Sequence, residues 1–139
     1  MNKSNFQFSR PFLRELSFKE NEAFKQNNDS RNIVLRNFLS LNIKKDANES
    51  FALVELALEV KAVNEEEGPF HIKARIAAVF KWDPNMNQQI DKMLKINAPA
   101  LLLSYLRPIV SQSTSYTMFP SYDIPFINFT DGDIKVKYE

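Results

Sequence analysis

The segment "SFALVELALEVKAV" (residues 50–63) alternates apolar with polar or small side chains along most of its length. A period of two is typical of a β-strand that buries one face. A second alternating segment, "FHIKARIAAVFKW" (residues 70–82), follows after the turn "NEEEGP" (residues 64–69). The two segments predict neighbouring antiparallel strands whose buried faces carry Val54, Leu56, Leu58, Val60, Ala62, Phe70, Ile72, Ala74, Ile76, Ala78, Phe80 and Trp82.

Two more strands are expected ahead of this pair. Residues 6–18 alternate in the same way, and the predicted apolar face carries Phe6, Phe8, Phe12, Leu16 and Phe18. Pro11 in this segment favours a bulge or an edge position, because proline has no N–H for the strand ladder. Residues 33–44 form the other predicted strand, whose apolar residues in register are Leu39, Leu41 and Ile43.

The period changes after the fourth predicted strand. Residues 88–117 place apolar side chains at helical spacing, among them Leu102, Leu106 and Ile109. We expect Asn97 to cap the helix, with Pro99 tolerated in its first turn. Pro108 lies inside the predicted helix and indicates a kink or a break there.

These elements predict one α+β domain over residues 1–139: a four-stranded antiparallel sheet packed with a long C-terminal helix and an extended aromatic, proline-bearing tail. One helix covers only part of a sheet face. The remaining apolar surface favours self-association or ligand binding.

The composition of the chain argues against several classes of function. The net charge of +1 offers no general attraction for nucleic acid or for anionic membranes, and no segment has the length and apolarity of a membrane span. The chain has no Cys, one His (His71) and two Gly, so we expect no thiol chemistry, no metal site, no phosphate-binding loop and no cofactor. His71 is expected in a solvated or cross-strand structural role. We therefore predict a soluble, cytoplasmic protein that is not an enzyme.

The tail is the segment "YTMFPSYDIPFINF" (residues 116–129), which combines aromatic rings with two prolines. The prolines make a regular helix or a central strand unfavourable. Two interpretations stay open: the rings are core or an oligomer interface, or they wall an apolar groove for extended peptides.

Two segments resemble the SecB protein-export chaperones and their SecB-like relatives. The N-terminal "FQFSRPFLRELSF" is similar to the first strand of that family. The stretch "APALLLSYLRPIVSQSTSYTMFPSYDIPFINF" is similar to its helix and the tail that follows. The order of four strands and then this helix also matches, so the resemblance covers nearly the whole chain.

The resemblance implies a homotetramer, built as a dimer of dimers, that holds unfolded polypeptide clients without ATP. It also implies that client grooves lie between sheet, helix and tail. The positions that match groove-lining family residues are Leu39, Leu41, Ile43, Tyr122 and Ile124. Two tail rings, Phe126 and Phe129, are added from the pattern of the tail itself.

The chain departs from the family where members dock on the SecA motor through acidic residues. Glu15 matches one such position, whereas Lys19 and Lys73 stand at two others and His71 replaces an apolar neighbour. A reversed charge turns attraction into repulsion. The residues after the tail, "DGDIKVKYE", also show neither the family's second helix nor its acidic tail. These departures argue against SecA docking, and SecB-like members that serve antitoxins make an antitoxin the other implied partner.

We therefore predict an ATP-independent holdase for unfolded or nascent polypeptides. The alternative is a non-catalytic adaptor on the same fold that binds one defined partner. Replacing Tyr122 and Phe126 together by Asp is expected to weaken client binding and to leave the tetramer intact, whereas loss of the tetramer would mark the tail as core.

Overall fold

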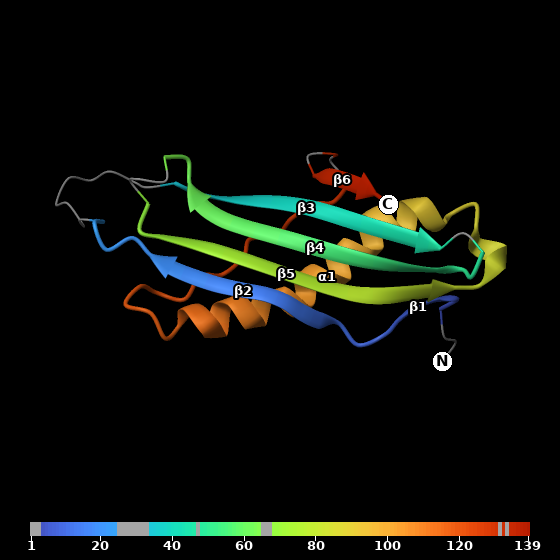
Figure 1. Cartoon of the computed structure of the whole chain (residues 1–139), viewed down its shortest axis with the longest axis horizontal. Coiled ribbons are helices and arrows are strands. Elements are labelled where there is room, and N and C mark those ends of the chain that lie inside the picture. Colours follow the sequence, from blue (N-terminus) through green and yellow to red (C-terminus); the bar gives the residue numbers. More distant parts are fainter. Residues whose placement is uncertain (1–3, 25–33, 47, 65–67, 131, 133) are drawn as a thin grey trace.

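The computed structural model describes residues 4–24, 34–46, 48–64, 68–130, 132 and 134–139. Its elements follow the order β1 (Phe6–Phe8), β2 (Phe12–Glu20), β3 (Leu35–Asp46), β4 (Phe51–Ala62), β5 (Phe70–Trp82), the 3-10 helix η2 (Pro84–Met86), α1 (Ile90–Thr114) and β6 (Lys135–Tyr138). The order β1-β5-β4-β3-β6, with β2 also paired to β5, makes one six-stranded sheet. Helix α1 crosses one side of this sheet, and none of the described residues forms a helix on the opposite side (Figure 1).

The α+β class is confirmed, but the prediction of a four-stranded sheet is wrong. The first predicted strand is divided at Pro11 into β1 and β2, which pair one after the other with β5. Ser9 keeps the connection close to the sheet, because its N–H donates to the carbonyl of Val79 at 2.9 Å. The sixth strand, β6, lies parallel to β3 and comes from residues for which the sequence predicts no strand.

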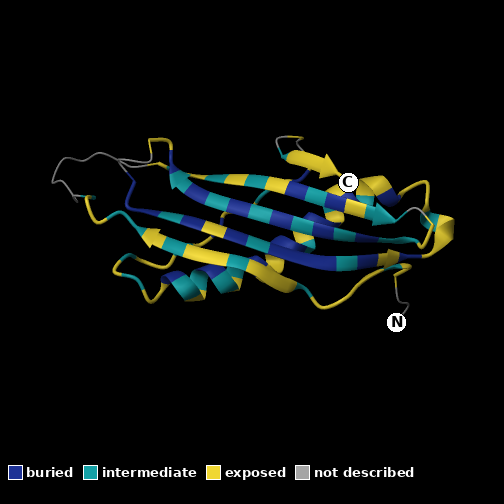
Figure 2. Cartoon of the chain, viewed as in Figure 1, coloured by how far each residue is buried: buried dark blue, intermediate teal, exposed yellow. Residues whose placement is uncertain are grey.

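The faces of the central strands agree with their alternation. Strand β4 alternates between buried and half-buried residues along its whole length, and every residue predicted for the buried face of β4 and β5 is buried. Figure 2 shows these two strands as the most buried part of the sheet, with exposed residues concentrated on β2 and β6. The core therefore lies between the helix side of β3, β4 and β5 and one stripe of α1.

The first predicted strand does not keep all its apolar residues on one face. Phe12 pairs with Ala77, whereas Leu13 pairs with Ile76, which faces the helix. The register shifts between Leu13 and Glu15, because the extra residue Arg14 forms a bulge. Phe12 consequently lies on the side of the sheet away from the helix, where the Arg14 guanidinium sits 5.3 Å from its ring.

Helix α1 begins at Ile90, so the predicted cap at Asn97 is wrong. Burial of Ile90 and Leu94 extends the helix toward its N-terminus and outweighs the preference of Asn for a cap position. Pro99 and Pro108 both lie inside the helix, which continues past each of them without a break. The buried stripe that holds it to the sheet is Ile90, Leu94, Ala98, Pro99, Leu102, Leu103, Leu106, Val110 and Thr114.

Candidate peptide-binding surface

The tail crosses the helix side of the sheet. After α1 ends, the ring of Phe119 lies 5.4 Å from that of Phe70 at the start of β5. Three residues later, the Tyr122 hydroxyl donates to Asn37 Oδ1 on β3 at 2.7 Å. The tail therefore spans from β5 to β3, and the chain then leads to β6 at the edge of the sheet (Figure 1).

Polar contacts from α1 fix this irregular segment. The Tyr122 N–H donates to Thr114 Oγ1 at 2.7 Å, and the Ser111 hydroxyl lies 3.1 Å from Asp123 Oδ1. One turn earlier on the helix, Arg107 Nη2 donates to the carbonyl of Pro125 at 2.8 Å. A proline-bearing segment cannot satisfy its backbone in a regular ladder, so these contacts take that role.

Tyr122 is anchored at both its backbone and its hydroxyl. Burial raises the pKa of the Tyr122 phenol, and the hydrogen bond with Asn37 opposes that shift only in part. The side chain is therefore neutral at physiological pH and acts as a donor to Asn37. Tyr122 is half-buried, so part of the residue remains accessible at the surface.

The seven predicted client-binding residues fall into three groups by exposure. Phe126 is 88% exposed, and Leu39 and Tyr122 are half-buried. The structure places the others in the core, where Leu41 and Ile43 are 1% and 0% exposed. The buried group is Leu41, Ile43, Ile124 and Phe129.

The side chain of Phe126 lies beside an arginine of α1. The Arg107 guanidinium that binds the tail carbonyl also lies 5.7 Å from the centre of the Phe126 ring. Two further apolar side chains of the tail segment, Tyr116 and Met118, are largely exposed. Met118 was missed from the sequence, because no period exists in this segment to separate inward from outward positions. We call the accessible apolar side chains of β3 and the tail the accessible candidate surface: Leu39, Tyr116, Met118, Tyr122 and Phe126.

A second apolar strip lies between the N-terminal strands and the helix. Phe8 pairs with Phe80, Leu13 with Ile76 and Leu16 with Ala74, so these side chains face the helix side. Each of the three is nevertheless exposed, as is Tyr105 of α1, whose ring lies 6.2 Å from that of Phe8. We call Phe8, Leu13, Leu16 and Tyr105 the β2 strip.

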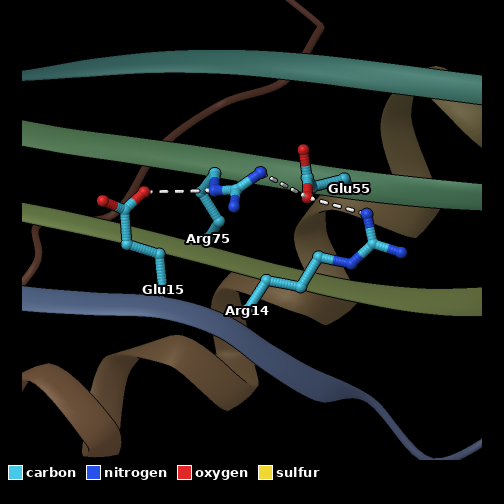
Figure 3. A network of polar contacts seen from close by, with 4 residues as sticks. All are labelled: Arg14, Glu15, Glu55 and Arg75. Atoms are coloured by element: carbon cyan, nitrogen blue, oxygen red, sulfur yellow. Dashed lines mark hydrogen bonds and ion pairs between the residues drawn. The ribbon is translucent and has the colours of Figure 1, made fainter.

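Glu15, the predicted partner-binding residue, belongs to an ion-pair network on the opposite face. Figure 3 shows its carboxylate accepting from Arg75 Nε at 3.1 Å. Arg75 Nη1 and Arg14 Nη1 each reach Glu55 Oε1 at 3.3 Å. The structure thus gives Glu15 a cross-strand partner within the sheet, and does not bring it together with the tail residues.

His71 belongs to a neighbouring pair on the same face. Its Nε2 lies 2.6 Å from Glu59 Oε1 across the β4–β5 ladder, which agrees with the expected cross-strand role. Burial opposes ionisation of Glu59, but hydrogen bonds from His71 and Lys61 outweigh it and lower the pKa of the carboxyl below its ordinary value. Among the residues that the structure describes, no three His, Cys, Asp or Glu side chains converge on a metal-sized site. None of the described helices is long and apolar enough to cross a bilayer.

Comparisons with known proteins converge on one family. A family model described as preprotein translocase subunit SecB matches residues 1–131. The protein-export protein SecB of Rickettsia akari is 33% identical over 91 residues, which cover 66% of this chain and 60% of that protein. The protein-export protein SecB of Orientia tsutsugamushi (strain Boryong) is 30% identical over 94 residues, covering 67% of this chain and 58% of that protein. The match thus spans less than two thirds of the length of these relatives.

The fold also has a solved counterpart. The SecB-like chaperone of Mycobacterium tuberculosis, in complex with a peptide from the HigA1 antitoxin, superposes with a TM-score of 0.69. The superposition covers 88% of this chain and 91% of that one, at 14% sequence identity. At this identity the likeness concerns the fold: a sheet with one long helix after it.

Proposed function

The chain belongs to the SecB family, and we propose that it is a cytoplasmic chaperone that holds unfolded or nascent polypeptides without ATP. The observation that carries the proposal is Phe126, an exposed ring held in place by Arg107 and the anchored tail. Exposed apolar side chains that gather in one region mark interaction sites, and Phe126 shares its segment with the exposed Tyr116 and Met118.

Client contacts are proposed at the accessible candidate surface. Leu39, Tyr122 and Phe126 are predicted positions that a polypeptide can reach in this structure, and Tyr116 and Met118 extend the surface along the tail. Aromatic rings and a flexible Met accommodate many sequences, because their contacts do not depend on one hydrogen-bond pattern. Such a surface suits a protein that binds unfolded chains of varied sequence.

Self-association is part of the proposal. The β2 strip leaves four large apolar side chains exposed on the helix side, where a second copy of the chain would cover them. We propose the homotetramer, a dimer of dimers, that the family resemblance implies. Several surfaces on one assembly would bind one long client together, and their combined affinity exceeds that of each surface.

The proposed cycle has no catalytic step and consumes no nucleotide. With two glycines, Gly68 and Gly132, the chain cannot supply a glycine-rich loop that cradles phosphates. Client release then depends on transfer of the client or on its folding. Membership of a family of export chaperones supports this non-enzymatic role.

An adaptor with one defined partner is the second candidate. It is favoured by the rigid anchoring of the tail through Tyr122 and Arg107, which presents a fixed shape. By analogy with the mycobacterial neighbour, that partner would be an antitoxin. Docking on the SecA motor is not part of the proposal, because Glu15 is paired with Arg75, and Lys19 and Lys73 add positive charge to that face.

The test compares two exposed phenylalanines, one in the tail and one in strand β2. Phe126 and Phe12 are both exposed, and an arginine guanidinium lies over each ring. A labelled protein that is reduced and carboxymethylated, and so stays unfolded, is titrated with wild type, Phe126→Asp and Phe12→Asp while fluorescence anisotropy is recorded. We expect Phe126→Asp to weaken binding about tenfold, as loss of an interface anchor does, and Phe12→Asp to bind as wild type does.

The structure also shows why the double substitution at Tyr122 and Phe126 is harder to interpret than the single substitution at Phe126. Tyr122→Asp would break the anchor to Asn37, so its effect would mix folding with binding. Equal losses in Phe126→Asp and Phe12→Asp would contradict the proposed surface. Binding of an antitoxin peptide without binding of the unfolded protein would favour the adaptor.

A further inference from the structure

Strand β6 occupies the edge of β3. Its residues run parallel to β3, with Ser40 opposite Lys135 and Ile43 opposite Tyr138. The ladder is extended by the N–H of Glu139, which donates to the carbonyl of Ile43 at 3.0 Å. β6 lies at the outer edge of the sheet, beside one half of β3 (Figure 1).

The residues of β3 that lie beside β6 are more buried than the residues that lie beyond it. On the helix side of β3, Leu35, Asn37 and Leu39 are half-buried, whereas Leu41 and Ile43 are fully buried. These last two residues lie opposite β6, and the first three lie beyond it. The predicted groove residues Leu41 and Ile43 are therefore inaccessible to a client while β6 and its surroundings keep this arrangement.

β6 itself has the features of a strand that opens easily. All four of its residues are exposed, and its two apolar side chains, Val136 and Tyr138, leave much of their surface in water. Tyr138 has the Lys95 ammonium 5.2 Å from its ring centre, an interaction at the protein surface. Short elements with exposed hydrogen bonds and little apolar burial open at low free energy.

Resting on the proposed function, we infer that the β3 edge at Ser40–Ile43 is a main-chain binding site for the client. In the absence of a client, β6 of the same chain occupies this site. An extended client segment takes the place of β6 as the edge strand and puts apolar side chains at the positions of Val136 and Tyr138. Displacement of β6 frees the main-chain hydrogen-bonding groups of Ser40–Ile43 for this segment.

The sequence of β6 indicates what the site accepts. In "KVKY" (residues 135–138), apolar side chains alternate with polar ones, which the β3 register directs to the two faces of the sheet. Main-chain hydrogen bonds along a strand edge do not depend on the sequence of the added strand. The site therefore fits an extended polypeptide with an apolar side chain at every second position, which unfolded chains of many sequences supply.

A disulfide lock tests the inference directly. The natural chain has no Cys, so Ser40→Cys with Lys135→Cys introduces a single pair at exposed, opposite positions. Neighbouring strands lie about 4.8 Å apart, a separation that a disulfide spans. The matched control is Ser17→Cys with Lys73→Cys, which are also exposed and opposite each other but lie at the β2–β5 ladder.

Affinity for the reduced, carboxymethylated protein is measured for each variant with the disulfide oxidised and then reduced. We expect the oxidised Ser40→Cys/Lys135→Cys protein to bind about tenfold weaker or worse, with recovery on reduction, because the competent state is no longer populated. The control should bind equally in both redox states. Hydrogen exchange on the wild type should show, on client binding, faster exchange in residues 136–139 and retained protection in Ser40–Ile43.

Equal binding by the oxidised and reduced β6 lock would overturn the inference and leave the proposed function standing. A lock that changes the assembly mass and leaves client affinity unaltered would assign the edge to a second copy of the chain, which also overturns it. Absence of binding by wild type and by all variants would reject the proposed function, and the inference with it.

Discussion

Two regions were predicted to line the same groove, and they differ in how far their apolar side chains are buried. On β3, Leu41 and Ile43 are buried in a core that also contains residues of α1 and the tail, and they lie opposite β6 in the sheet. In the tail, Phe126 stands in water with Arg107 beside its ring. Residues of similar apolarity therefore hold the fold together in one region and remain available for binding in the other.

The difference shows that alternation in a sequence determines which face a side chain lies on, but not how far that side chain is buried. Alternation along β3 decides that Leu41 and Ile43 face the helix side, and elements distant in the sequence then decide how fully they are covered. The tail has prolines in place of alternation, and side-chain contacts from α1 position it. The four predictions below test this contrast in order of decreasing effect on stability.

The largest effect is expected at the buried end of β3. Ile43→Ala removes a fully buried side chain between the sheet and α1 and should lower the free energy of unfolding by about 2–5 kcal/mol. Urea denaturation followed by the fluorescence of Trp82, the single tryptophan, measures it. A loss under about 0.5 kcal/mol would mean that β3 is not part of the core at this position.

A smaller effect is expected where the tail is anchored. Tyr122→Phe keeps the ring and removes the hydroxyl that donates to Asn37, so the free energy of unfolding should fall by about 0.5–1.5 kcal/mol. Tyr116→Phe is the matched control, because that residue is largely exposed. Equal values for the two variants in the same urea titration would show that the contact with Asn37 does not hold the tail.

The third prediction concerns pH on the face away from the helix. The pKa of Glu59 is lowered on folding, so its stabilising contribution is present above the unfolded pKa, near 4.5, and is lost as pH falls through the folded pKa. Glu59→Gln should therefore cost no more than about 1 kcal/mol at pH 7, since the pair with His71 is partly exposed. Unfolding curves of the two proteins should converge as the pH falls below the lowered pKa of Glu59 in the folded state. A difference that grows on acidification would reverse the assigned sign.

The smallest effect on stability is expected at the exposed ring. Phe126→Ala should change the free energy of unfolding by less than about 0.5 kcal/mol, because the side chain has little burial to lose. Thermal and urea unfolding beside Ile43→Ala give the comparison in one experiment. A loss as large as that of Ile43→Ala would place Phe126 in the core and remove the contrast between the two regions.

The sequence predicted the parts of the fold that repeat a period. The buried faces of β4 and β5 follow from alternation over a dozen residues each, and Leu102 and Leu106 lie on the buried stripe of α1 as their spacing indicates. The bulge at Arg14 could not be located by counting, so Phe12 was assigned to the wrong face. Four residues of alternation in β6 are too few to identify a strand without the β3 edge that it joins.

The sequence indicated which types of residue form the candidate site, but not which of them are exposed. Alternation and family likeness selected Leu39, Leu41 and Ile43 together, yet only Leu39 lies beyond the reach of β6 and stays half-buried. In the tail, Ile124 is buried and Phe126 is exposed, and Arg107 binds the carbonyl of Pro125 between them. Contacts of this kind join residues far apart in the chain and leave no periodic signal.

The central claim is that this chain holds unfolded polypeptides as an assembly. Light scattering on size-exclusion fractions, with and without a reduced, carboxymethylated protein, tests it most directly. We expect a particle with the mass of four chains that gains the mass of the unfolded protein when the two are mixed. A particle that elutes at the same mass in both runs, with the unfolded protein in separate fractions, would contradict it.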